Sequence, residues 1–316
     1  AEGQDAVFTV KLTSISATDT VVTLGVTATG ATGQAASTDI KALEYFNGTS
    51  WVAVPVNGQV TIAAGQTELQ VRVPTVQDSV YEGNENFQIT ANLSPAVGAT
   101  GTGTIVDDGS PTPPPPGPGP FPTPEDDRPR VQGVSNATAI EGGSSSIAKD
   151  LIFDVTLSNR STTETTVTLD LNTATTNGAT ITGTALDIGV RSVSFDGGKT
   201  YTVFTGNDIK VPANTDPTQI KVKLEVLNDS LVENTETLTL SAKTQYETGA
   251  GQTGTGTILD NDSQGITIGG NGTTPALGNV LVAEGQDAVF TVKLTSISAS
   301  DTVVTLGVTA TGATGQ

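Results

Sequence analysis

Two acidic patterns recur in the sequence, and each of them occurs twice. The first pattern, Asp-x-x-x-Glu-x-x-Glu, occupies residues 78–85 and again residues 229–236. The second pattern, Gly-Thr-Gly-Thr-Ile-x-Asp followed by Asp or Asn, occupies residues 101–108 and again residues 254–261. Carboxylates that gather in one place repel one another unless cations neutralise them. The repetition therefore predicts cation binding in both places, with a merely solvated acidic surface as the alternative.

The residue types that are missing narrow the chemistry. The chain has no His, no Cys and no Met among its 316 residues. This excludes disulfides, thiolate and imidazole metal ligands, Cys nucleophiles and His-based catalytic triads. The remaining ligands are hard oxygens, and these favour Ca2+, which takes about six to eight oxygens in flexible geometry. Backbone carbonyls and waters would complete each calcium shell.

The charge of the chain argues against two classes of partner. The 33 acidic residues outnumber the 14 basic ones, which gives a net charge of −19. Nucleic-acid phosphates and anionic membrane surfaces would repel such a chain. No apolar run approaches the roughly 18 residues needed to span a bilayer, so we expect no membrane insertion in this segment.

The segments between the acidic patterns have the two-residue period of β-strands. Phe8, Val10 and Leu12 alternate with polar residues, and the same alternation recurs over residues 153–157 and 220–226. No stretch keeps the apolar stripe of a helix. Short Thr- and Val-rich strands with glycine turns, in units of about 100–130 residues, are typical of an immunoglobulin-like sandwich. We therefore predict an all-β chain of tandem immunoglobulin-like β-sandwich modules.

The chain also repeats itself along its length. Residues 283–316 copy residues 1–34 with one change, Thr18 to Ser300, at an offset of 282. Residues 111–129 hold ten of the 16 prolines, which favours a polyproline II spacer that is either free-standing or docked. We predict a first module over 1–109 that lacks its strand A, a Pro-rich linker over 110–129, a second module over 130–263, and strands A to C of a third module over 264–316.

Taken in order, residues 1–12, Asp39, residues 78–89 and residues 101–108 resemble the Calx-beta domain. That family is a β-sandwich that binds calcium in animal sodium–calcium exchangers and recurs in very large, secreted bacterial surface proteins. Residues 195–200 are similar to its bacterial, adhesin-type branch. The resemblance covers nearly all of both full modules and implies tandem calcium-binding sandwiches.

The resemblance also implies where the ligands meet, because the turns that carry them share one pole of such a sandwich. The predicted ligands of the first module are Glu2, Asp39, Asp78, Glu82, Glu85, Asp107 and Asp108. Those of the second are Glu141, Asp187, Asp229, Glu233, Glu236, Asp260 and Asp262, and the third module begins with Glu284. Gln77 and Asn228 stand where the family often has a second Asp, which leaves the number of calcium ions open.

Near-identical tandem copies favour a structural role. We predict a non-catalytic section of a large extracellular bacterial surface protein, an adhesin stalk or a surface fibre, that calcium at the module poles makes rigid. A calcium-sensing regulatory module and a glycan-binding module are the alternatives. Paired carboxylates could hydrolyse glycosides, but Trp51 is the only tryptophan and few aromatic residues could stack on a sugar, so we predict no enzyme.

The incomplete first module indicates the partners. Its missing strand A matches the region of residues 280–282, near the other end of the chain. An open sandwich edge attracts strands, so we expect further copies of the repeat, in the same chain or in neighbouring chains, and cell-surface or matrix glycans as further candidates. A continuous repeat in one polypeptide is favoured, because residues 283–316 duplicate strands that the first module already has. A multi-chain filament linked by donated strands is the alternative.

Overall fold

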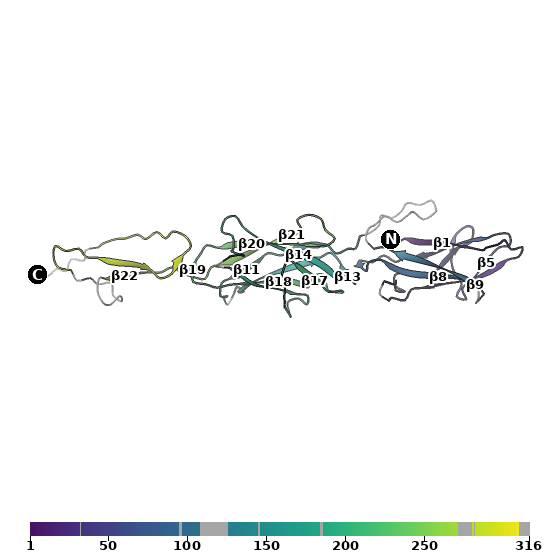
Figure 1. The fold of residues 1–316 in the computed structure, drawn as a ribbon, viewed down its shortest axis with the longest axis horizontal. Helices are drawn as coiled ribbons and strands as arrows, with labels where there is room; N and C mark the ends of the chain where they lie inside the picture. The colour runs from purple at the N-terminus through teal and green to yellow at the C-terminus, as the bar shows by residue number, and fades with distance from the viewer. Residues whose placement is uncertain are drawn as a thin grey trace.

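The structure is a computed structural model that describes residues 1–31, 33–94, 97–107, 126–144, 146–183, 186–270, 280 and 282–309. These residues form strands and no helix, as the two-residue apolar period predicts. They accordingly contain no helix that could cross a membrane. Figure 1 shows three bodies that follow one another along the long axis of the molecule, with β1 in the first, β14 in the second and β22 in the third.

The first body, module 1, is a sandwich of two four-stranded antiparallel sheets. Their strand orders are β1-β6-β3-β4 and β5-β2-β8-β9, so that β1 and β9 are edge strands among the described residues. The strands of the first sheet are β1 (Asp5–Lys11), β6 (Glu68–Pro74), β3 (Glu44–Phe46) and β4 (Trp51–Ala53). Those of the second are β5 (Gln59–Ile62), β2 (Thr20–Thr27), β8 (Glu85–Ser94) and β9 (Val97–Ile105).

The second body, module 2, has two five-stranded sheets and a first strand that is divided between them. One sheet has the order β10-β12-β18-β15-β16 and the other has the order β11-β21-β20-β14-β17. The bounds of the first sheet are β10 (Val131–Val134), β12 (Asp150–Leu157), β18 (Ile220–Val226), β15 (Ile188–Ser194) and β16 (Thr202–Val203). Those of the second are β11 (Ala137–Ile140), β21 (Gln252–Leu259), β20 (Glu236–Thr244), β14 (Thr165–Thr173) and β17 (Asp208–Val211). β10 pairs antiparallel with β12, and β11 pairs parallel with β21.

The third body contains one two-stranded sheet, formed by β22 (Ile266–Gly270) and β23 (Phe290–Leu294). Residues 302–309, the copy of β2, form no strand, although we predicted strand C there. The partners of β2 in module 1 are β5 and β8, and residues 283–316 include no copy of either strand. Strand C therefore lacks the backbone partners that it has in module 1.

Two short parallel strand pairs join the bodies to one another. β7 (Val80–Tyr81) of module 1 pairs with β13 (Arg160–Ser161) of module 2. β19 (Leu231–Val232) of module 2 pairs in the same way with β24 (Ile297–Ser298) of the third body. Both junctions thus use the segment of the Asp-x-x-x-Glu-x-x-Glu pattern, which links the acidic patterns to the contacts between bodies.

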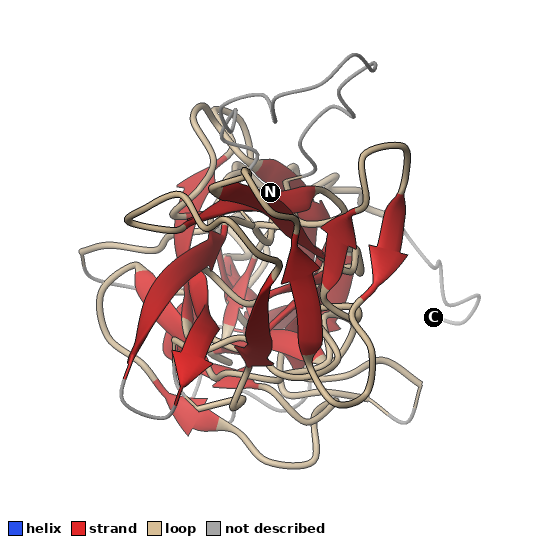
Figure 2. Ribbon diagram, turned by 90° about the vertical axis from the view of Figure 1, so that its right-hand side faces the viewer, coloured by secondary structure: helices blue, strands red, loops and turns tan. Residues whose placement is uncertain are grey.

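Each module has its own apolar core between its two sheets. Phe87 at the centre of module 1 and Phe153 at the centre of module 2 are fully buried. A Cβ on Gly103 would lie 2.3 Å from the ring of Phe87, which explains why the Gly-Thr-Gly-Thr-Ile pattern needs a glycine there. Figure 2, viewed along the long axis, shows strands on all sides of this interior.

Candidate metal centres

Among the residues that the structure describes, acidic side chains gather in four groups, two in each module. Within each group, carboxylate oxygens of three residues lie within 4.8 Å of one another. The groups are Glu2, Asp107 and Asp127; Asp39, Glu82 and Glu85; Glu141, Asp260 and Asp262; and Asp187, Glu233 and Glu236. Eleven of the fifteen residues predicted as ligands belong to one of these groups. The structure thus places acids of both sequence patterns close to one another in space.

The first group of module 1 forms where its first and last strands meet. Glu2 precedes β1, and its backbone N–H donates to the carbonyl of Val106 at 3.3 Å, which brings it beside the end of β9. Asp107 follows β9, and its Oδ2 accepts the backbone N–H of Glu82 at 2.8 Å. This bond holds the loop between β6 and β8 against the end of β9, and the loop carries Glu82 of the second group.

The second group of module 1 is built on that loop and on the turn before β3. Thr38 Oγ1 donates to Asp39 Oδ1 at 2.9 Å, and the backbone N–H of Val76 donates to the carbonyl of Asp39 at 2.8 Å. Glu85 begins β8, where it pairs with Ile105. The two groups of module 1 therefore lie at the same pole of the sandwich.

Module 2 repeats this arrangement with its own residues. The backbone N–H of Glu233 donates to Asp260 Oδ2 at 2.6 Å, as that of Glu82 does to Asp107. The backbone N–H of Asp262 donates to Asp260 Oδ1 at 2.6 Å. Asp187 accepts the backbone N–H of Thr180, and its carboxylate lies within 4.8 Å of those of Glu233 and Glu236.

Asp127 is a member of the first group that the sequence patterns did not predict. It lies near the end of the proline-rich linker, is only 3% exposed, and accepts hydrogen bonds from Gln77 Nε2 at 3.2 Å and from Asn159 Nδ2 at 2.9 Å. One signal pointed to it. The second acidic pattern continues to Asp262 in module 2 but to Gly109 in module 1, so module 1 is short of one acid at that position.

The remaining predicted ligands belong to none of the four groups found among the described residues. Asp78 and Asp229 are exposed, and their Oδ1 atoms accept the backbone N–H groups of Val80 and Leu231, each at 2.7 Å. Glu284 is exposed in the third body and belongs to none of the groups among the described residues. Asp108 lies outside the described residues.

Several oxygens of these groups are buried without any hydrogen-bond donor. They are Glu2 Oε2, Asp107 Oδ1, Glu141 Oε2, Glu236 Oε2 and Asp262 Oδ2. A buried acceptor without a partner loses the full energy of its hydration, and the loss is larger for a charged group. A cation placed among these carboxylates would satisfy the oxygens and cancel their repulsion. The residues present therefore fit a hard divalent cation.

The electrostatics of module 1 are those of uncompensated negative charge. Burial, together with the charges of Asp107 and Asp78, raises the pKa of Glu2 to about 8. Burial likewise raises the pKa of Asp107 to about 7. For Glu85, burial and the charge of Glu82 raise the pKa to about 8.

The carboxyl groups of module 2 show the same raised pKa values. Burial raises the pKa of Glu141 to about 7, although the backbone of Asp229 opposes the change. Burial and a hydrogen bond with Asp187 raise the pKa of Glu236 well above its usual range. In both modules the buried glutamates beside other carboxylates therefore resist ionisation, and a bound cation would oppose this effect.

Comparison with known proteins gives one family match. The model of the Calx-beta domain family matches residues 4–108 and residues 149–264, one match in each module. No curated protein matches the chain.

Solved structures with a similar arrangement have low sequence identity. Calcium binding domain CBD12 of CALX1.1 is 14% identical, with 76% of this chain and 75% of that chain covered and a TM-score of 0.25. The CupB6 tip adhesin from Pseudomonas aeruginosa is 9% identical, with 83% of this chain and 93% of that chain covered and a TM-score of 0.30.

Proposed function

The chain belongs to the Calx-beta domain family, and from this premise we propose that it is a non-catalytic structural section of an extracellular bacterial surface protein. Its part in that protein is a stalk or a surface fibre. Calcium at the pole of each module makes the connection to the next module rigid. Residues of all four acidic groups hold the calcium, and bound calcium supplies the positive charge that lets their carboxylates stay ionised.

One observation carries this proposal: the loop that supplies the ligands also supplies the strand at each junction. β7 lies between Asp78 and Glu82, and it pairs with β13 of the next body. β19 lies between Asp229 and Glu233, and it pairs with β24. A cation that fixes Glu82 or Glu233 therefore also fixes the strand that contacts the next body.

Asp127 supports a direct connection at the first junction. Its carboxylate lies in the group with Glu2 and Asp107 of module 1 and also accepts the amide of Asn159, the residue before β13 of module 2. Asn159 Nδ2 in addition donates to the carbonyl of Ser79 at 3.2 Å, and the ring of Tyr81 packs 5.3 Å from that of Tyr246. The Asp127 carboxylate, the linker that carries it and both modules thus form one contact region.

Calcium is the cation that suits these donors. The groups contain only carboxylates, and hard oxygen donors favour calcium over metals that prefer nitrogen or sulfur. Extracellular modules bind calcium with dissociation constants of roughly 0.1–1 mM, which is enough when the ion is abundant outside the cell. A structural role requires that the calcium site is always occupied. It does not require a response to small changes in calcium concentration.

Small-angle X-ray scattering of the full chain tests the proposal. In millimolar calcium we expect a narrow distribution of interatomic distances with a long maximum dimension, and in excess chelator a broader distribution from bending at the junctions. Identical profiles in the two conditions would contradict the proposal. A change of shape at micromolar calcium would instead favour a calcium-sensing module, because sensors respond at about 0.1–10 µM.

A further inference from the structure

A polar hollow lies in module 1 between the turn that joins β3 to β4 and the loop that joins β5 to β6. We call it the turn pocket. Its lining residues come from two stretches of the chain, 45–48 and 61–70. Its volume of about 660 Å³ is within the usual range of sites for small ligands. The turn pocket is therefore large enough for a small ligand.

The connections around the turn pocket are shorter than their counterparts in module 2. Residues 47–50 join β3 to β4, whereas residues 195–201 join β15 to β16. Residues 63–67 precede β6, whereas residues 212–219 precede its counterpart β18. Less chain is thus available in module 1 to cover this position.

In module 2 the two longer connections meet. The backbone N–H of Gly197 donates to the carbonyl of Gln219 at 3.0 Å, and a Cβ on Gly197 would lie 2.1 Å from Gln219 Oε1. In module 1 the turn closes on itself, because the backbone N–H of Asn47 donates to the carbonyl of Ser50 at 3.0 Å. A Cβ on Gly48 would meet no described atom within 4 Å. The turn pocket is therefore open where module 2 is closed.

Amide side chains supply much of the polar lining of the turn pocket. The side-chain amides of Gln66 and Gln70 are exposed and have no hydrogen-bond partner among the described residues. Asn47 Oδ1 accepts the backbone N–H groups of Thr49 and Ser50, each at 3.0 Å, and so shapes the turn. An amide both donates and accepts hydrogen bonds, as a sugar hydroxyl does. The two glutamines can therefore bond with a ligand that carries hydroxyl groups.

Phe46 supplies an apolar surface beside these amides. Its neighbour Tyr45 pairs with Val71 and packs against the core of module 1. Phe46 is the next residue of the strand, so its ring points to the other face of the sheet. The ring centroid lies 5.5 Å from that of Trp51. An aromatic ring with hydrogen-bonding groups around it suits the C–H face and the hydroxyls of a sugar.

The charge of the lining disfavours an anionic ligand. Glu68 is the only charged side chain among the described lining residues, and its Oε1 accepts the Nζ of Lys11 at 2.8 Å. A phosphate or a sialylated sugar would meet this carboxylate in a chain with a net charge of −19. A neutral ligand avoids this repulsion.

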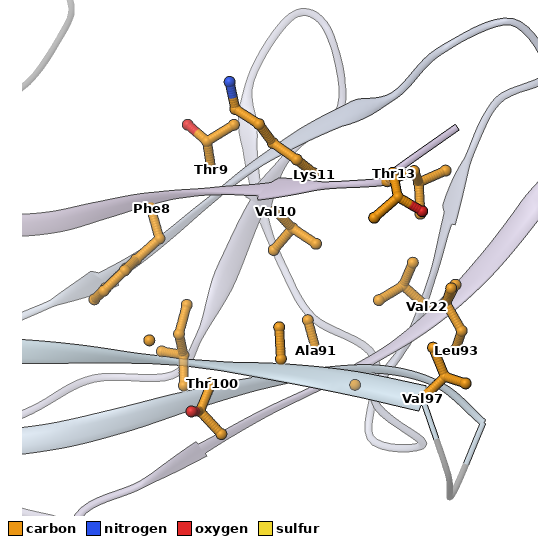
Figure 3. Close-up of a pocket in the computed structure, with 15 residues that line it drawn as sticks. Phe8, Thr9, Val10, Lys11, Thr13, Val22, Ala91, Leu93, Val97 and Thr100 are labelled. Atoms are coloured by element: carbon orange, nitrogen blue, oxygen red, sulfur yellow. The ribbon is translucent and has the colours of Figure 1, made fainter. Parts of the chain in front are cut away.

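The apolar groove between β1 and β9 offers different chemistry. Figure 3 shows Phe8 and Val10 pointing from β1 toward Ala91 on the opposite sheet, while Thr9 and Lys11 point away from it. The described lining of this groove contains no amide and no carboxylate side chain. A sugar would exchange most of its hydration for apolar contacts there, which costs free energy. The turn pocket is the better site for a polar ligand.

We propose that the turn pocket binds a neutral saccharide. The ring of Phe46 packs against the C–H face of one sugar ring, and the amides of Gln66 and Gln70 bond with its hydroxyls. The pocket lies away from the acidic groups, because β6 begins beside it at Glu68 and ends at Pro74, before the acidic loop. This binding goes beyond the function proposed above and uses none of the calcium ligands, so it holds whether or not calcium is bound.

An array of immobilised oligosaccharides tests the proposal with the full chain attached to fluorescent beads. Many copies on one bead raise the apparent affinity of a weak site. We expect binding to a subset of the neutral oligosaccharides, in millimolar calcium and equally in excess chelator, which separates this test from that of calcium binding. A chain that binds no neutral oligosaccharide, or that binds only sialylated ones or the unglycosylated peptide spots, would overturn the proposal.

Alanine variants locate the binding in the turn pocket. Calorimetric titration measures the affinity of each variant for the neutral oligosaccharide that gives the strongest array signal. Gln66→Ala and Gln70→Ala should each weaken binding about fivefold, the effect of one hydrogen bond. Gln88→Ala removes an exposed side chain of the same type from β8, in the other sheet, and should leave the affinity unchanged. Equal affinities of the three variants would contradict binding in the turn pocket.

Discussion

Modules 1 and 2 build the same group of three carboxylates from different stretches of sequence. In module 2, Asp260 and Asp262 are neighbours after β21, and Glu141 completes the group. In module 1, Asp127 comes from the end of the proline-rich linker and joins Glu2 and Asp107. The third carboxylate has the same place in both groups, but it comes from a different place in the sequence. The difference shows that the pole needs a third carboxylate, and that the linker of module 1 is tied to the site it follows.

Removing calcium tests the acidic groups of both modules at once. We expect excess chelator to lower the melting temperature of each module by on the order of 10 °C. A saturated site contributes about 2.7 kcal/mol at about a hundredfold excess of ligand over its Kd.

The two modules can be followed separately in that experiment. Trp51, the only tryptophan, lies in module 1, where the guanidinium of Arg72 stands 4.7 Å from its ring centroid. Its fluorescence reports module 1, and circular dichroism reports the whole chain. A module 1 transition that chelator leaves unchanged would mean that Asp127 does not complete a calcium site.

The raised carboxylate pKa values give a pH dependence of defined sign. Glu2 and Glu85 have ordinary pKa values of 4.5 and folded values of about 8. Such a group binds its proton more tightly in the folded state, so its contribution to stability is complete below pH 4.5 and is lost as the pH rises through about 8.

The metal-free chain should therefore melt about 5 °C higher at pH 5 than at pH 8. In millimolar calcium the order should reverse, because calcium binds ionised carboxylates. Melting curves in chelator that rise with pH over this range would show that the carboxylates are not crowded as described.

Much of this arrangement follows from the sequence, and the exceptions have physical reasons. The alternation at Phe8 and at Phe153 predicted the strands, because one face of each strand must enter the core. The run Glu125-Asp126-Asp127 indicates either a solvated stretch or an ion ligand, and the sequence does not decide between them, because a segment rich in proline has no period that fixes where it returns. The junction strands β7 and β13 have two residues each, too few to show any alternation.

Asp78 and Asp229 mark a second limit of the sequence patterns. Both belong to the repeated acidic pattern, but each carboxylate accepts a backbone N–H two residues ahead, at Val80 and at Leu231. Asp commonly closes a turn in this way. The pattern alone does not separate an acid that shapes the loop from one that faces the other carboxylates.

Two core substitutions compare the burial of β1 in module 1 with that of β12 in module 2. Val155→Ala removes a fully buried side chain beneath β10 and should cost about 2 kcal/mol of unfolding free energy. Val10→Ala, at the half-buried counterpart, should cost less than about half of that in the monomer. Urea unfolding of the two variants measures both values. Equal costs would mean that Val10 is buried as deeply as Val155.

The smallest expected effect separates the two ways of completing the acidic group. Asp127→Asn and Asp262→Asn each replace one carboxylate by an amide of the same shape, and each should weaken calcium binding on the order of tenfold in calorimetric titrations. Only Asp127→Asn should also loosen the junction between modules 1 and 2, because Asp127 contacts Asn159. Equal flexibility of the two variants in scattering experiments would contradict a connecting role for Asp127.

Anomalous diffraction from crystals of the chain grown in millimolar calcium is the most direct test of the account. We predict a calcium peak among Glu2, Asp107 and Asp127, with the Asp127 carboxylate facing the ion and the amide of Asn159 still bonded to it. A pole without any ion at that calcium concentration, or an ion from which Asp127 has turned away, would contradict the claim that calcium holds the linker and both modules together.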